Sequence, residues 1–167
     1  MSGGGNCRNP DLAAKFILAA RSCNCNPSQC ISNNIEWIVV PAFKTTADAN
    51  SWLNAHCGED EKLREKAMES KFWLHDAVHI SFECGLCGLC FRMTCELIPE
   101  GKLIRYGHYH IKVGDKQSWS CRISLATLEK VFEGMREYFD IFVYKSWCKE
   151  FFKNVNNTIC DENNNKH

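Results

Sequence analysis

The sequence has neither an excess of one charge nor a long apolar run. Its 20 lysines and arginines balance 20 aspartates and glutamates, so we expect no broad nucleic-acid binding through phosphate contacts. No stretch reaches the roughly 18 apolar residues that a membrane-spanning helix needs, and no membrane partner is expected. Residues 1–16 contain no basic region followed by an apolar run, so we expect no secretory signal peptide. The sequence therefore favours a reducing, intracellular compartment.

Motifs of common enzyme classes are also missing. The sequence contains no phosphate-binding glycine loop and no G-x-G-x-x-G. It contains neither H-E-x-x-H nor the H-x-E…P-C-x-x-C pattern of zinc deaminases. A thioredoxin-type site would need C-x-x-C at the start of a helix, whereas here this motif precedes a predicted strand. We therefore expect a protein that is not an enzyme.

Cysteine, in contrast, is abundant, with 12 in 167 residues. Secreted chains use such cysteines for disulfides, whereas chains in reducing compartments more often use them to bind metal. Because a reducing compartment is expected, zinc is the usual explanation for so many thiols. The hydrophobic content of 45% is sufficient for a packed core, and the length fits a single domain.

The hydrophobic spacing predicts an α+β domain over residues 9–152, with a flexible N-terminus at 1–8 and an Asn-rich tail at 153–167. Strands are predicted from alternating or continuous apolar runs at 35–43, 78–83, 91–98, 102–113 and 118–123. Helices are predicted from Asn9-Pro10, with Phe16 on the apolar face, over 46–70 in two pieces, and from Ser124 as the N-cap. We expect the last three strands to form an antiparallel β-meander, turning at "PEGK" and "GDKQ", with helices packed on one face.

The stretch "CGLCGLC" holds the highest density of metal-ligating side chains. Cys87 and Cys90 form a C-x-x-C pair, and two thiolates at this spacing can bind one ion. His108 and His110 stand two apart in a predicted strand, so both imidazoles project from the same face. Cys121 lies on the next predicted strand, across one turn. We therefore predict a structural zinc site of Cys87, Cys90, one or both of these histidines, and Cys121; inert thiols and a redox pair are the alternatives.

A second group of cysteines surrounds Pro27 in a predicted loop, namely Cys23, Cys25 and Cys30. With Cys7 or His56 as a fourth ligand, this group could bind a second metal ion, and a set of inert thiols is an equally favoured reading. Cys84 and Cys95 are spare candidates for the main site.

Two kinds of binding surface remain open from the sequence. Exposed aromatic side chains near the C-terminus could anchor a partner protein, although core packing is the preferred reading for most of them: Tyr144, Trp147, Phe151 and Phe152. A basic meander with two stacking tyrosines could instead bind nucleic acid, through Arg92, Lys102, Arg105, Lys112, Lys116, Arg122, Tyr106 and Tyr109.

Several short motifs follow one another between residues 30 and 150. They are Cys30 followed by Glu36-Trp37 and "VVP" at 39–41, the cysteine cluster with "RMTC" at 92–95, His108-Tyr109-His110, "SWSC" at 118–121, and a helix with Leu128, Phe132 and Met135. In this order they resemble the adenovirus early region 4 34K control protein family. At the position of residues 108–111, that family has an H-C-H-C motif. This chain has Tyr109 and Ile111 in place of the two cysteines.

The resemblance implies a viral early regulatory protein, a zinc-stabilised adaptor in the host nucleus and cytoplasm. Members of the family bridge a cullin–elongin ubiquitin ligase to host proteins, have another viral early protein as partner, and promote export of viral mRNA. The alternative function is a zinc-dependent nucleic-acid-binding module.

Overall fold

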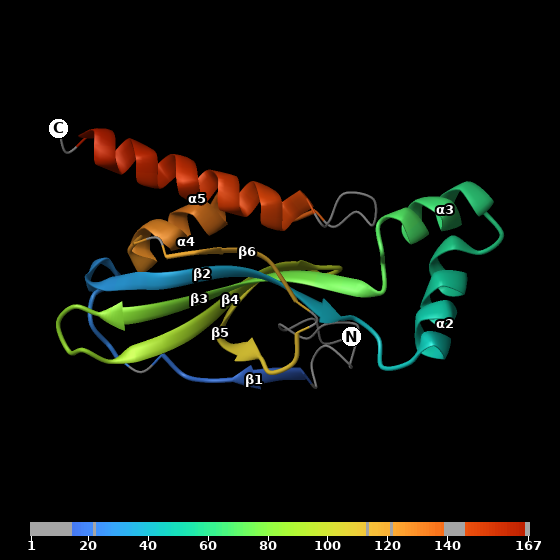
Figure 1. The fold of residues 1–167 in the computed structure, drawn as a ribbon, viewed down its shortest axis with the longest axis horizontal. Coiled ribbons are helices and arrows are strands. Elements are labelled where there is room, and N and C mark those ends of the chain that lie inside the picture. The colour runs from blue at the N-terminus through green and yellow to red at the C-terminus, as the bar shows by residue number, and fades with distance from the viewer. Residues whose placement is uncertain (1–14, 22, 113, 121, 139–145, 166–167) are drawn as a thin grey trace.

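An antiparallel sheet of six strands forms the centre of the fold, in the order β1-β5-β4-β3-β2-β6 (Figure 1). The computed structural model describes residues 15–21, 23–112, 114–120, 122–138 and 146–165. The strands are β1 (Phe16–Leu18), β2 (Cys30–Pro41), β3 (Leu74–Cys84), β4 (Cys90–Ile98), β5 (Gly101–Tyr109) and β6 (Gly114–Trp119). The predicted α+β class with an antiparallel sheet is confirmed.

The described helices begin where short polar side chains can cap them. Thr45, Asp60 and Ser124 each accept a hydrogen bond from a backbone N–H in the first turn of the helix that follows. The helices are the 3₁₀ turn η1 (Pro27–Gln29), α2 (Thr46–Cys57), α3 (Glu61–Glu69), α4 (Leu125–Glu133) and α5 (Ser146–Asn165). The two-piece helix over 46–70 and the Ser124 cap are therefore confirmed, and α5 continues across residue 152.

The main core lies between one face of the sheet and helices α4 and α5 (Figure 1). Val78, Ile80 and Phe82 alternate along β3 and are fully buried on this face, as their spacing predicts. The helices contribute large side chains with at most 2% exposure, including Leu125, Leu128, Trp147, Phe151 and Phe152. For the last three, which were also candidates for aromatic anchors of a partner, the preferred reading of core packing is confirmed. Tyr144 lies outside the described residues.

The opposite face of the sheet carries a smaller core, to which β1 contributes Phe16. The predicted helix from Asn9 is wrong at Phe16–Leu18, which form a strand paired with β5. Lys15 is helical, and residues 9–14 lie outside the described residues. The Phe16 ring meets the Tyr109 ring edge-on at 5.0 Å and lies 3.6 Å beneath the Arg105 guanidinium. These contacts across the sheet outweigh a helical spacing of apolar residues that is only a local signal.

The third strand of the predicted meander lies elsewhere. Strands β4 and β5 pair as predicted, but β6 pairs with β2 at the opposite edge of the sheet, with Ile35 opposite Trp119. The sequence "GDKQ", predicted as a turn, forms most of β6. In the sheet, β1 occupies the position beside β5, while the Trp119 ring packs against Phe152 of α5 at 4.6 Å. The chain therefore crosses the sheet between β5 and β6.

Helices α2 and α3 lie beyond one end of the sheet rather than on its face (Figure 1). They connect β2 to β3 and enclose a small core of their own, formed by Ala49, Leu53, Cys57, Ala67 and Phe72. Trp52 stacks on Phe72 with ring centres 5.4 Å apart. The predicted packing of helices on one face thus holds for α4 and α5.

Candidate metal centre

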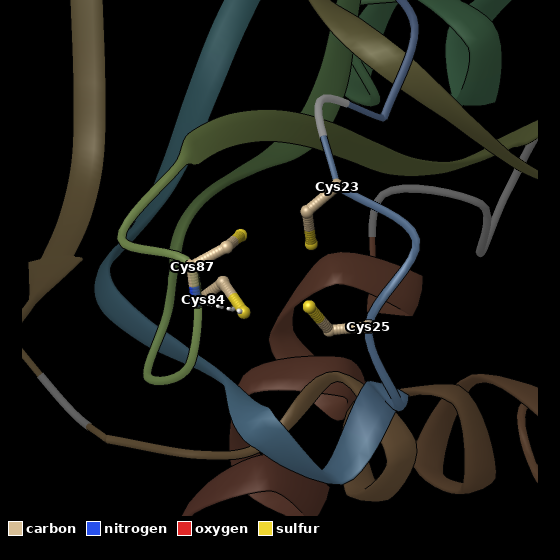
Figure 2. Close-up of side chains that lie close together, drawn as sticks. All are labelled: Cys23, Cys25, Cys84 and Cys87. Carbon is tan, nitrogen blue, oxygen red and sulfur yellow. Dashed lines mark hydrogen bonds between the residues drawn. The ribbon is translucent and has the colours of Figure 1, made fainter.

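Four cysteine side chains point toward a common centre at one end of the sheet (Figure 2). The sulfur atoms of Cys23, Cys25, Cys84 and Cys87 all lie within 4.8 Å of one another. Cys23 and Cys84 are buried, Cys25 is half-buried and Cys87 is exposed. No disulfide joins the nine cysteines whose side chains the structure describes. This cluster could hold a metal ion.

Strand pairing brings these distant segments together. Cys30, the first residue of β2, is the register partner of Cys84, the last residue of β3. The amide of Gly85 donates to the carbonyl of Gln29 at 2.8 Å, which extends this pairing into the loops. The segment that precedes β2 therefore lies beside the turn that follows β3. As a result, the C-x-C pair of Cys23 and Cys25 faces the C-x-x-C pair of Cys84 and Cys87.

The β3–β4 turn presents backbone N–H groups to the sulfur atoms. The amide of Cys87 donates to the Cys84 sulfur at 3.4 Å, and the amide of Gly88 donates to the Cys84 carbonyl at 2.9 Å. Gly88 has φ of 75°, a left-handed conformation that glycine adopts without strain. Amides directed at sulfur stabilise a thiolate, which is the form of cysteine that binds metal.

Two of the four thiols are tuned toward the thiolate form. Hydrogen bonds from the backbone amides of Cys87 and Leu86 lower the pKa of Cys84 to about 6, and a backbone hydrogen bond from Cys25 lowers the pKa of Cys23. The neighbouring Cys84 sulfur raises the pKa of Cys25 to about 12. For Cys87, the Leu89 amide lowers the pKa, but burial and Cys84 raise it overall. Without metal, the four sulfurs therefore share protons, and a cation can replace those protons.

A positive charge lies beside the cluster. The Arg21 guanidinium contacts the sulfurs of Cys23 at 3.8 Å and Cys30 at 3.4 Å, and it also donates to the carbonyl of Cys25. It lies 5.6 Å from the centre of the Phe91 ring. Four thiolates around a divalent cation carry a net charge of about −2, so Arg21 offsets part of that charge.

The geometry fits a tetrahedral thiolate site closely. Zinc bound at about 2.3 Å to each sulfur separates the sulfurs by about 3.8 Å. Inward movement of the side chains by about 1 Å or less from the observed spread would therefore complete the coordination. Four protein sulfurs fill all four positions and leave no position for water or substrate, which is the arrangement of structural rather than catalytic zinc.

Of the predicted zinc ligands that the structure describes, only Cys87 belongs to this cluster. Cys90 is exposed at the start of β4, where it pairs with Glu83. The His108 ring stacks on His79 at 3.8 Å, and His110 is exposed just after β5. Among the residues that the structure describes, no other cluster of potential metal ligands is found.

Cys121 lies outside the described residues. The hairpin that was expected to bring it beside His108 does not form, because β4, β3 and β2 separate β5 from β6. At about 4.8 Å per strand, the two strands are roughly 19 Å apart.

The cluster combines cysteines from both groups in the sequence. Cys23 and Cys25 come from the group around Pro27, for which a second metal site and inert thiols are equally favoured from the sequence, and Cys84 is a spare candidate for the predicted main site. One local signal distinguishes the overlapping C-x-x-C pairs. Gly88 follows Cys87, whereas Phe91 follows Cys90, and a glycine after the second cysteine permits the left-handed turn that directs amides at sulfur.

A buried polar network lies on the other face of the sheet. Glu96, fully buried, accepts hydrogen bonds from His75 at 2.7 Å, the Tyr109 hydroxyl at 2.5 Å and Arg105 at 3.3 Å. Burial raises the pKa of Glu96, but the His75 hydrogen bond and the nearby positive charges lower it overall. The amide of Tyr109 donates to His79 at 3.1 Å. Because its donors neutralise and satisfy the carboxylate, this network is a structural element of the sheet.

Several cations of the predicted nucleic-acid surface have partners within the protein. Lys102 donates to the carbonyls of Phe132, Glu133 and Met135 at the end of α4. Lys112 pairs with Glu36 at 2.6 Å. Arg105 pairs with buried Glu96, and Tyr109 is itself buried. The described part of the predicted meander thus presents fewer positive charges for binding nucleic acid than its sequence implies.

Comparison of the chain with models of protein families gave no match. Comparisons with curated proteins and with solved structures gave no match either. In the part of the chain that the structure describes, no helix is long and apolar enough to cross a membrane.

Proposed function

We propose that this chain is a zinc-stabilised adaptor protein without enzymatic activity, in which the four-cysteine cluster holds one structural zinc ion. The observation that carries the proposal is the approach of four sulfurs from two distant segments to within 4.8 Å of one another. Soft thiolate ligands in a tetrahedral set favour zinc or iron–sulfur chemistry. Four sulfurs without an open position favour a structural role for the ion.

The zinc ion would connect the N-terminal part of the chain to the sheet. Cys23 and Cys25 follow β1 in a segment whose described residues form no regular secondary structure. Cys84 is the last residue of β3, and Cys87 lies in the turn to β4. Binding energy at such a site adds directly to folding energy, because the unfolded chain does not hold the ligands together. The ion would therefore fix both β1 and the β3–β4 turn.

Exposed apolar side chains on these same segments support a docking role. Leu86 is 69% exposed and Leu89 is 47% exposed, and they flank Cys87 at the tip of the β3–β4 turn. Ile17 and Leu18 of β1 are exposed by 59% and 71%. A metal ion that fixes the two segments would present these four side chains in a defined arrangement, which lowers the entropic cost of binding a partner.

The resemblance to the adenovirus early region 4 34K control protein family supports the kind of partner. We propose that the chain acts in the host nucleus and cytoplasm as a viral early protein, bridging host proteins that include a cullin–elongin ubiquitin ligase, with another viral early protein as partner and an effect on viral mRNA export. The described parts of the motifs behind the resemblance lie mainly on β2, β4, β5, β6 and α4 and in the β3–β4 turn. One of these motifs contributes Cys87 to the four-cysteine cluster.

The zinc proposal is tested by elemental analysis of the full chain, purified under reducing conditions without a metal-affinity tag. We expect about one zinc ion per chain, and loss of cooperative unfolding when a chelator removes it. Iron with visible absorption would contradict zinc as the metal. The absence of any metal, together with unfolding that a chelator does not change, would contradict the site itself.

The adaptor proposal is tested by quantitative pulldown from cells that express the full chain, with elongins and cullins as the readout. The double variant Leu86→Ser with Leu89→Ser should keep zinc and lose the partners, whereas Cys57→Ser, in the separate α2–α3 core, should keep both. Repeated absence of elongins and cullins with the unaltered chain would remove this form of the proposal. Retention of RNA that declines steeply with salt would favour the nucleic-acid alternative.

A further inference from the structure

A fifth thiol lies beside the four-cysteine cluster without belonging to it. The Cys30 sulfur is 3.7 Å from the Cys23 sulfur, close to van der Waals contact. Cys30 is fully buried. A tetrahedral ion accepts four sulfurs, so a thiol remains next to a ligand when the cluster is filled.

The surroundings of this pair allow one sulfur to move and hold the other in place. Cys30 is fixed as the first residue of β2, opposite Cys84 in β3. Cys23 lies in the segment between β1 and η1, whose described residues form no regular secondary structure. A change in the direction of the Cys23 side chain is therefore sufficient to move its sulfur from the metal to the neighbouring Cys30 sulfur.

The Arg21 guanidinium bridges the two sulfurs, at 3.8 Å from Cys23 and 3.4 Å from Cys30. Zinc would bind the Cys23 sulfur as a thiolate, which is the form that reacts with peroxides, and the guanidinium faces both sulfurs. Cys23 is 5% exposed and lies among half-buried Cys25 and exposed Cys87, so a molecule as small as hydrogen peroxide has a route to its sulfur.

We propose that Cys23 and Cys30 form an oxidative modification site, in which a disulfide between them releases the metal held by Cys23. This inference rests on the proposed zinc site and adds its regulation. The Cys23 thiolate attacks one oxygen of hydrogen peroxide, the O–O bond breaks, and a sulfenic acid and hydroxide form. The Cys30 thiol then attacks the Cys23 sulfur, the S–O bond breaks, and the disulfide and water form. The two sulfurs together lose two electrons and peroxide gains two, so the step needs no further reactant.

Formation of this disulfide leaves Cys25, Cys84 and Cys87 as the remaining ligands. A three-sulfur site has an open position and binds zinc more weakly than the closed site does. Loss of the ion then releases β1 and the β3–β4 turn from each other, although both stay within the sheet. Peroxide would thus weaken the binding of a partner protein by releasing zinc, and a thiol reductant would restore it.

The test uses the full chain loaded with zinc, whose metal content is measured first under reducing conditions. Hydrogen peroxide is then added, zinc release is followed with a chromogenic chelator, and the thiols are mapped by differential alkylation and tandem mass spectrometry. Cys23, Cys25 and Cys30 occur in one tryptic peptide, between Arg21 and Lys44. The fragmentation must therefore show protected Cys23 and Cys30 with alkylated Cys25.

We expect the unaltered chain and the Cys57→Ala control to release zinc together with formation of the Cys23–Cys30 disulfide, and dithiothreitol to restore binding. Cys30→Ala should bind zinc and release it more slowly by on the order of tenfold, because the second sulfur is missing. Equal release from Cys30→Ala, or a different disulfide in the unaltered chain, would overturn the inference and leave the zinc site intact. If the reduced chain holds no zinc, the proposed function fails and the inference fails with it. Mapping in the unaltered chain decides the matter even if Cys30→Ala does not fold.

Discussion

Gly107 of β5 faces the backbone of Ile17 in β1 so closely that a Cβ atom at position 107 would lie 2.0 Å from the Ile17 carbonyl oxygen. The φ angle of Gly107 is 121°, in a region that other residues rarely adopt. Strand β1 can therefore dock at this edge only against a glycine. Because β1 leads directly into Cys23, this contact also helps to position the metal centre.

The first prediction concerns this contact. Gly107→Ala should destabilise the folded state by about 2–4 kcal/mol, since it combines steric overlap with backbone strain. Chemical denaturation measures the loss, and hydrogen exchange should accelerate at the amides of Ala19 and His110, which bond across the β1–β5 pair. Gly114→Ala is the matched control, because no atom lies within 4 Å of its added Cβ. Equal stability of the two variants would contradict the close approach.

The second prediction separates the four-cysteine cluster from the ligand set expected from the sequence. Cys25→Ser should lose zinc and cooperative unfolding, because structural zinc contributes on the order of 10 kcal/mol to folding. Cys90→Ser should keep its zinc, since Cys90 does not belong to the cluster. Elemental analysis of both variants decides between the sets. Zinc retained by Cys25→Ser and lost by Cys90→Ser would restore the site predicted with His108, His110 and Cys121.

The third prediction concerns stability at acid pH. Burial, with the charge of its neighbour His108, lowers the pKa of His79 to about 3, and burial lowers the pKa of His108 to about 4. The unfolded chain takes up these protons below about pH 6.5, whereas the folded chain resists them. Stability should therefore be complete above that pH and fall as the pH drops toward 4. Each histidine contributes a slope of about 1.4 kcal/mol per pH unit.

Denaturation measured between pH 7 and pH 4 tests this slope. His79→Asn should reduce it by about half. Glu96 adds to the loss in the same direction below about pH 4.3, because its pKa is lowered in the folded state and protonation removes that stabilisation. Stability that rose on acidification from pH 6.5 would contradict the buried neutral histidines.

The fourth prediction concerns the end of α4. Lys102 donates to three backbone carbonyls there and lies 5.1 Å from the centre of the Phe132 ring. Lys102→Met should cost about 1–3 kcal/mol, since two partly buried acceptors and one exposed acceptor lose a charged donor. Denaturant midpoints measure the effect, with Lys149→Met at an exposed position of α5 as the control. Indistinguishable midpoints would show that water replaces the lysine without loss.

Local patterns predicted those parts of the fold whose signal is local. Alternation of Val78, Ile80 and Phe82 predicted a strand with one buried face, and Ser124 before an apolar helical stripe predicted the start of α4. The side-chain period and the capping hydrogen bond depend only on neighbouring residues, so the sequence contains them in readable form. The abundance of cysteine predicted thiols that could hold a metal ion, and four of them lie close together.

Which cysteines form one metal site was harder to predict from the sequence. The predicted site combined Cys87 and Cys90 with ligands from the next hairpin, and it required β6 to lie beside β5. In the structure, β6 lies beside β2. That position depends on the packing of Trp119 against Phe152 and on β1 at the other edge. Contacts of this kind join residues far apart in the chain, and no spacing within a motif encodes them.

The sequence by itself determined most of the central strands and helices, the Ser124 cap and the kind of ligand that a metal could find here, because each depends on the chemistry of residues a few positions apart. Only the tertiary structure decided which cysteines meet. The pairing of β2 with β3 places Cys30 opposite Cys84 and so carries Cys23 and Cys25 to Cys87. Such a convergence follows from the register of a sheet, which is set by the burial of whole strand faces rather than by any local run of residues.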